Sequence, residues 1–132
     1  MTPPERTDGM GTDRELLEAA AKAAGYGDGL YGELSGDAPV LYFQSVGLWD
    51  PLGDDGDALR LAVRRRFHIN IFSAGTSEGI DTPGFVEIWS EGDSDPIVTE
   101  YVKGGDYDAA TRRAITRAAA AIGAGETTGE TR

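Results

Sequence analysis

The sequence predicts a small α+β domain, with a mainly antiparallel sheet of about four strands and three helices packed on its faces (an α/β/α sandwich), in the order α-β-α-β-β-β-α. Two observations predict this class. Apolar residues recur at helical spacing behind capping residues at about residues 13–24, 55–65 and 108–122. Between these segments lie short runs of β-branched and aromatic residues, bounded by glycine, proline and aspartate.

The length of 132 residues suits one domain. We expect a disordered leader at residues 1–11, a single domain at 12–123 and a disordered tail at 124–132, because both ends are polar and rich in threonine, glycine and charge. The absence of cysteine excludes disulfides and thiolate metal sites. No apolar run approaches the roughly 20 residues of a membrane span, and no signal peptide is evident. We therefore expect a cytoplasmic protein.

The formal net charge is −11, from 23 acidic and 12 basic residues. Binding to nucleic acid depends on Lys and Arg that replace counterions, so this charge argues against tight nonspecific binding. Most of the basic residues lie on the predicted helices, and the segments 26–59 and 67–102 contain none. The predicted strands and loops are therefore acidic.

The first helix is expected at about residues 13–24. Thr12 and Glu15 have the spacing of a capping box, and Gly25 suits the left-handed residue that closes a helix. Residues 25–39 hold five glycines and predict a loop or a weak edge hairpin. Residues 40–49 are β-rich and mostly apolar, which predicts one largely buried strand.

The stretch from Trp49 to Arg66 joins this strand to a second helix. Asp50 and Pro51 predict a turn, and Asp54 or Asp55 is expected to cap a helix from about Asp55 to Arg65. The apolar residues that share one face of this helix, and are expected to face the core, are Leu59, Ala62 and Val63.

The second half of the chain predicts three strands and a helix. A strand is expected at residues 67–72, a polar loop at 75–84, and a hairpin of strands at 85–90 and 97–102. The last helix is expected to run from Asp106 to about Ile122 and to end at Gly123. Its expected buried stripe is Ile115, Ala118, Ala119 and Ile122, with an Asp108–Arg112 pair and with Arg113, Thr116 and Arg117 facing solvent.

Three segments, Thr12–Gly25, Trp49–Val63 and Ala109–Gly123, resemble the phage ABA sandwich domain family, and Asp54–Val63 is the most specific part. The resemblance implies a β-sheet with helices on its faces and an origin in a phage or prophage. It implies no catalytic activity. At Asp50, before Pro51, the resemblance leads us to expect asparagine instead.

Four motifs have a candidate chemistry and a simpler reading. Gly27–Gly32 matches the dinucleotide pattern GxGxxG, but it follows a predicted helix and not a strand. The aspartates of residues 50–57 could bind a hard cation, yet their spacing does not fit a calcium loop. His68, the only histidine, is expected to be a packed or surface strand residue. Glu87 and Glu100 could approach across the hairpin as an acid and a base, an arrangement that chance also produces in an acidic sheet.

Two groups of residues are candidates for contact with a partner. The first is the basic end of the second helix, Arg64, Arg65 and Arg66. The second is the outward side of the 85–90 strand, Phe85, Glu87 and Trp89, together with Phe72, although we expect a helix to cover part of it.

We therefore expect a non-enzymatic phage accessory protein without a cofactor or metal, which contacts a host or phage protein in the bacterial cytoplasm. Inhibition of a host defence system such as CRISPR interference is a special case of this role. The alternative is a nucleic-acid-binding module that uses the arginine-bearing helix faces. An enzyme with an unrecognised site is a third reading, and self-association is left open.

Overall fold

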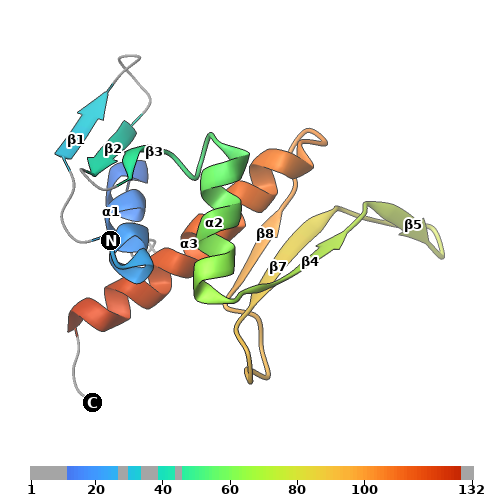
Figure 1. The fold of residues 1–132 in the computed structure, drawn as a ribbon. Coiled ribbons are helices and arrows are strands. Elements are labelled where there is room, and N and C mark those ends of the chain that lie inside the picture. Colours follow the sequence, from blue (N-terminus) through green and yellow to red (C-terminus); the bar gives the residue numbers. More distant parts are fainter. Residues whose placement is uncertain (1–11, 27–29, 34–38, 44–45, 129–132) are drawn as a thin grey trace, which may run out of the picture.

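The computed structural model describes residues 12–26, 30–33, 39–43 and 46–128. In the described residues the helices and strands are α1 Asp13–Ala24, β1 Leu30–Glu33, β2 Pro39–Phe43, β3 Gly47–Trp49, α2 Asp55–Arg65, β4 His68–Phe72, β5 Gly75–Ser77, β6 Ile80–Thr82, β7 Phe85–Trp89, β8 Val98–Tyr101 and α3 Tyr107–Thr128 (Figure 1). The α+β class is confirmed. The strands are divided between two antiparallel sheets, β1-β2-β3 and β4-β7-β8, and a separate hairpin, β5-β6, where we expected one sheet.

The central element is α3, the last helix of the chain (Figure 1). It packs against α1, α2 and the inner face of the β4-β7-β8 sheet. The side chains of Ala114, Ile115, Ala118 and Ala119 are buried, which confirms three of the four residues predicted for its apolar stripe, and Ile122 is partly buried. Thr116 is also fully buried, contrary to the prediction, and donates a hydrogen bond to the carbonyl of Arg112 at 2.8 Å. A helix enclosed by other elements has little solvent-facing surface, which a stripe pattern does not predict.

Arginines of α3 tie it to three other elements. Arg112 pairs with Asp55 of α2 at 2.7 Å, and not with Asp108 as predicted. Arg113 pairs with Asp13 of α1 at 2.9 Å, and Arg117 with Glu100 of β8 at 2.5 Å. Arg113 and Arg117 are therefore only partly exposed, although we expected them to face solvent.

Gly123 does not end α3, as the sequence suggested, because the helix continues to Thr128. A Cβ atom at Gly123 would lie 1.8 Å from the carbonyl oxygen of Ala19 and 3.2 Å from the backbone nitrogen of Ala23. Glycine at this position therefore permits the close crossing of α1 and α3. Residues 1–11 and 129–132, which belong to the predicted leader and tail, lie outside the described residues.

Two predictions for the strands were wrong. The predicted strand at 40–49 is replaced by two antiparallel strands, β2 and β3, and β1 pairs with the other side of β2. The predicted polar loop at 75–84 contains the β5-β6 hairpin, which extends away from the body of the protein (Figure 1). Its turn residues, Glu78 and Gly79, both have positive φ angles, 53° and 78°, as in the two-residue turns that match strand twist. Its polar strands show no apolar alternation, so the sequence gives no strand signal.

The helix α2 has the predicted bounds, and its cap is Asp54, whose carboxylate accepts a hydrogen bond from the Asp57 N–H at 2.8 Å. Its buried apolar residues are Ala58, Leu61 and Ala62. Leu59 and Val63, which we expected to face the core, are 60% and 67% exposed. Both faces have helical periodicity, and packing on α3 selects between them.

Candidate functional site

The outward face of the β4-β7-β8 sheet holds a row of three aromatic side chains. Phe72, Phe85 and Tyr101 are directly opposite one another on the three strands. The rings of Phe72 and Phe85 are stacked, with centroids 4.5 Å apart and planes 13° apart, and Tyr101 is 6.0 Å from Phe85. Phe72 is 42% exposed and Tyr101 is 57% exposed. We call these three residues the aromatic row.

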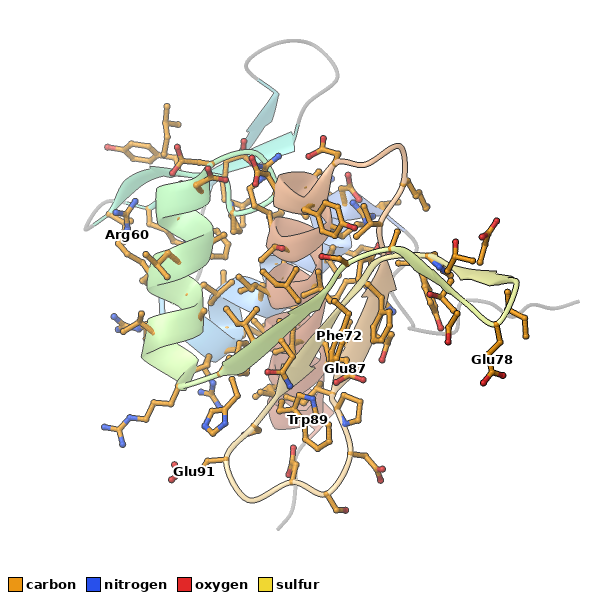
Figure 2. All side chains as sticks on the ribbon, turned by 90° about the vertical axis from the view of Figure 1, so that its right-hand side faces the viewer. Arg60, Phe72, Glu78, Glu87, Trp89 and Glu91 are labelled. Atoms are coloured by element: carbon orange, nitrogen blue, oxygen red, sulfur yellow. The ribbon has the colours of Figure 1, made fainter. Side chains whose placement is uncertain are left out.

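Glu87 and Trp89 lie on the same side of the sheet as the aromatic row (Figure 2). The indole N–H of Trp89 donates to the Glu87 carboxylate at 3.0 Å. The helix that packs on β7 and β8 is α3, and it lies on the opposite side of the sheet, where Val86 and Ile88 are buried. The expected helical cover is therefore absent within the described part of the chain.

The sheet separates the two glutamates that we considered as an acid and a base. Glu87 is opposite Thr99 and faces outward, whereas Glu100 is opposite Val86 and bonds to Arg117 on the inner face. His68 is an exposed residue at the start of β4, opposite Trp89. The structure therefore brings neither a carboxylate pair nor a histidine-centred site together at these positions.

Two of the three candidate arginines bind the C-terminus of α1. Arg64 donates from Nε to the carbonyl oxygen of Ala24 and lies over the ring of Tyr26, 5.3 Å from its centroid. Arg65 donates from Nη1 to the carbonyl oxygen of Ala23 at 3.0 Å. Carbonyl groups in the last turn of a helix have no hydrogen-bond donor within the helix, and these two arginine side chains provide one for each. Arg66 ends α2 in the left-handed conformation, with φ of 58°, and is exposed.

The acidic turn before α2 is held by hydrogen bonds to its own backbone. Asp57 is 7% exposed and accepts from the N–H of Asp50 at 2.9 Å and from Arg60 at 2.7 Å. Asp50 in turn accepts from the N–H of Gly53 at 3.2 Å. Within the described residues, no group of three or more acidic or histidine side chains has an arrangement that could hold a metal ion. These contacts assign the turn a structural role.

Asp50→Asn is expected to raise the free energy of unfolding at pH 7. Burial raises the pKa of the Asp50 carboxyl group above 3.8, the Gly53 N–H opposes this, and the charges of Asp57 and Asp54 add to it. The folded state then binds the proton more tightly than the unfolded state. The contribution of this group to stability is therefore complete below pH 3.8 and is lost as pH rises through the raised pKa. Asparagine keeps an oxygen for Gly53 and removes the charge.

Urea unfolding between pH 3 and pH 8 measures this effect, with Asp93→Asn in the exposed turn after β7 as a control that removes the same charge. The gain of the Asp50 variant should vanish at the acidic end of the range. A loss of stability at pH 7, or an equal gain from Asp93→Asn, would contradict the assignment.

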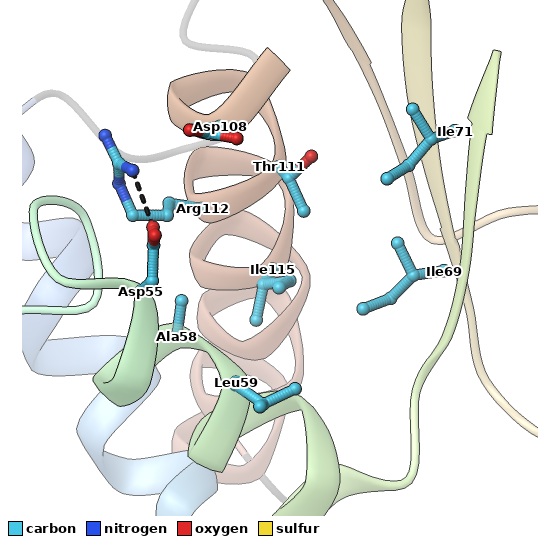
Figure 3. A pocket seen from close by; sticks show the side chains of 9 residues that line it. All are labelled: Asp55, Ala58, Leu59, Ile69, Ile71, Asp108, Thr111, Arg112 and Ile115. Carbon is cyan, nitrogen blue, oxygen red and sulfur yellow. Dashed lines mark hydrogen bonds and ion pairs between the residues drawn. The ribbon is translucent and has the colours of Figure 1, made fainter.

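An open groove that the sequence did not predict lies between α2 and β4, and α3 forms its floor (Figure 3). Its volume is about 230 Å³, and its lining is mostly apolar. Leu59 and Ile71, on its two walls, are 60% and 55% exposed. The lining residues are Asp55, Ala58, Leu59, Ile69, Ile71, Asp108, Thr111, Arg112 and Ile115. A signal for it exists in the sequence, since Leu59 is apolar but does not belong to the buried stripe that packs α2 on the core.

The GxGxxG match falls partly outside the described residues, and its last residue, Gly32, is in β1. Among the described helices none is long and apolar enough to cross a membrane. No protein-family model matches the chain, and neither the curated proteins nor the solved structures include a significant match. The resemblance to the phage ABA sandwich domain family accordingly stays a prediction from the sequence.

Proposed function

We propose that this chain is a non-enzymatic binding protein that contacts another protein through the outward face of the β4-β7-β8 sheet. The aromatic row supports this proposal. Exposed aromatic side chains are enriched among the residues that contribute most to the affinity of protein interfaces. Phe72 and Tyr101 are exposed, and stacking holds Phe72 against Phe85, so ordering these rings on binding costs little entropy.

The setting of this function follows from the sequence resemblance. We propose a phage or prophage accessory protein that acts in the cytoplasm of the bacterial host, on a host or phage protein. A net charge of −11 suits a partner with a basic surface, including a defence protein that binds nucleic acid. Inhibition of such a defence system, CRISPR interference among them, is the special case to test first.

Affinity purification from host cells, followed by measurement of Kd for each recovered protein, tests the proposal. Tyr101→Ala removes one member of the aromatic row and should weaken binding about ten-fold or more. Tyr42→Ala is the matched control, because Tyr42 is another exposed strand tyrosine, 46% exposed, on β2 of the other sheet. Equal affinity of the two variants would contradict the proposal, as would recovery of no protein under several conditions.

A plaque assay on a defence-bearing host, with and without this gene, tests the anti-defence case. More plaques with the gene, and no gain with Tyr101→Ala, are the expected results. Equal plaque numbers with and without the gene would exclude inhibition of that defence system.

Nucleic-acid binding through the arginine-bearing helix faces is less well supported. Arg64 and Arg65 bind carbonyls of α1, and Arg112 and Arg113 pair with acidic side chains. A short DNA or RNA duplex at low salt is the appropriate probe, because electrostatic attraction is greatest there.

A further inference from the structure

The strand β4 is at the edge of its sheet. It pairs with β7 on one side, and among the described strands none pairs with its other side. An exposed sheet edge offers unpaired N–H and C=O groups to another extended chain. Natural sheets often protect such edges with charged side chains or proline. The segment from His68 to Phe72 contains no proline and no Asp, Glu, Lys or Arg.

The register shows which backbone groups of β4 point to the free edge. Val102 donates to the carbonyl of Gly84, the residue before β7, at 2.9 Å, so the backbone groups of Gly84, and of every second residue after it, point toward β8. The backbone groups of the other β7 residues point toward β4, because direction alternates along an antiparallel strand. The β4 residues paired with this second set are His68, Asn70 and Phe72. The N–H and C=O groups of Ile69 and Ile71 therefore point away from β7, toward the groove.

The groove lies where the side chains of an added strand would be placed. Ile69 and Ile71 are directed from β4 toward α3, and Leu59 of α2 faces them across the opening (Figure 3). Every second side chain of a strand paired with β4 would enter this groove, and the others would extend the outward face next to Phe72. The volume of about 230 Å³ is below the roughly 300–1,000 Å³ typical of sites for small molecules. A few aliphatic side chains suit it better.

The charge at one end of the groove indicates which side chain the bound segment should carry there. Asp108 is exposed and lines the groove at the end nearer Ile71, and Asp55 lines it on the α2 side (Figure 3). Asp55 is paired with Arg112, whereas Asp108 has no ion-pair partner among the described side chains. A lysine or arginine at one end of the added strand would complement Asp108. A second copy of this chain is a poorer occupant, because each copy has a net charge of −11.

We propose that β4 and the groove beside it bind an extended segment of the partner protein, which adds to the sheet as a strand. The segment has aliphatic residues at alternate positions and a lysine or arginine at the end that meets Asp108. This inference rests on the proposed protein-binding function and specifies the chemistry of the partner. Main-chain hydrogen bonds to Ile69 and Ile71 supply affinity, and the groove and Asp108 supply specificity.

The test uses two synthetic ten-residue peptides of alternating valine and threonine, one with lysine at both ends and one with glutamate at both ends. Lysine at both ends places a cation near Asp108 whichever way the peptide runs. NMR titration of the full chain gives Kd, and amide hydrogen exchange reports on individual residues. We expect the lysine peptide to bind about ten-fold more tightly than the glutamate peptide. Its binding should also slow hydrogen exchange at the amides of Ile69 and Ile71.

Two pairs of variants locate the site. Leu59→Asp places a charge in the groove and should weaken binding of the lysine peptide about ten-fold. Val63→Asp changes a similarly exposed residue of α2 outside the groove and should leave the affinity for this peptide unchanged. Asp108→Lys should transfer the preference to the glutamate peptide. Glu91→Lys makes the same charge change in the exposed turn after β7 and should leave the preference as it is.

The outcomes separate this inference from the proposed function. Absence of lysine-peptide binding at millimolar concentration, or binding unaffected by Leu59→Asp, would overturn the strand-addition site. The site would also be overturned if a partner is recovered whose binding requires Tyr101 but is unaffected by Leu59→Asp and by competition with the peptide. That outcome would leave the proposed function intact. Peptide binding with the expected variant pattern supports the site, even if no cellular partner is recovered.

Discussion

Gly123→Ala is expected to lower the free energy of unfolding by about 3 kcal/mol, the upper end of the usual range for an overpacked core. The new methyl group would lie 1.8 Å from the carbonyl oxygen of Ala19, and this atom belongs to the backbone of α1. A flexible side chain could rotate away, but a helix backbone can only move as a unit. The crossing of α1 and α3 must therefore widen, and the contacts between buried alanines on both helices are lost.

The control for this variant is Gly125→Ala, two residues further along the same helix. A Cβ atom at Gly125 has no neighbour within 4 Å, so alanine should stabilise the helix there by about 0.5–1 kcal/mol. Urea unfolding monitored by circular dichroism gives both values. Stabilisation by both substitutions would show that α1 and α3 cross at a greater distance than the structure indicates.

Trp49→Ala is expected to cost about 3–5 kcal/mol, the usual range for removal of a large buried aromatic side chain. Trp49 is 1% exposed, at the end of β3. Its ring makes edge-on contacts with Tyr26 and Phe43, at centroid distances of 5.4 Å and 5.9 Å. Arg64 of α2 lies over the ring of Tyr26. Loss of the Trp49 ring should therefore also loosen the contact between α2 and the end of α1.

Trp49→Phe separates the contribution of the ring from that of its polar group. The indole N–H of Trp49 is buried and has no hydrogen-bond partner among the described residues. Phenylalanine removes this donor, whose burial without a partner costs roughly 1–3 kcal/mol, and it keeps much of the ring contact. Thermal unfolding should therefore rank Trp49→Phe close to the original chain and Trp49→Ala far below. Equal losses would indicate that the N–H has a partner in solution.

The helix ends were predictable because their signals are local. Thr12 accepts from the Glu15 N–H, and Gly25 adopts φ of 81°, as the sequence indicated for α1. Alternation also placed Phe85, Glu87 and Trp89 on the outward side of the 85–90 strand, and the residues between them, Val86 and Ile88, are buried. Gly123 misled us because a glycine that closes a helix and a glycine at a helix crossing look alike in sequence. Only the path of α1, about a hundred residues earlier in the chain, distinguishes them.

The candidate site was predictable in part. Alternation placed Phe85, Glu87 and Trp89 together on one side of a strand, but which side a helix covers depends on tertiary packing. The role of Arg64 and Arg65 depends on the end of α1, about 40 residues away in the chain, which no local pattern reports. The groove was not predictable for the same reason. Leu59 is apolar in the sequence, but whether another element covers it depends on tertiary packing.

The position of α3 at the centre of the fold has a consequence for the order of folding. Its contacts with α1 join the first and last described helices, and the Arg113–Asp13 pair spans 100 residues. Such nonlocal contacts slow folding, because a long loop must close before they form. During synthesis, α1, α2 and both sheets leave the ribosome before the helix on which they pack. The core can therefore be completed only after α3 has left the ribosome, and truncation before Gly123 should leave the earlier elements without their common support.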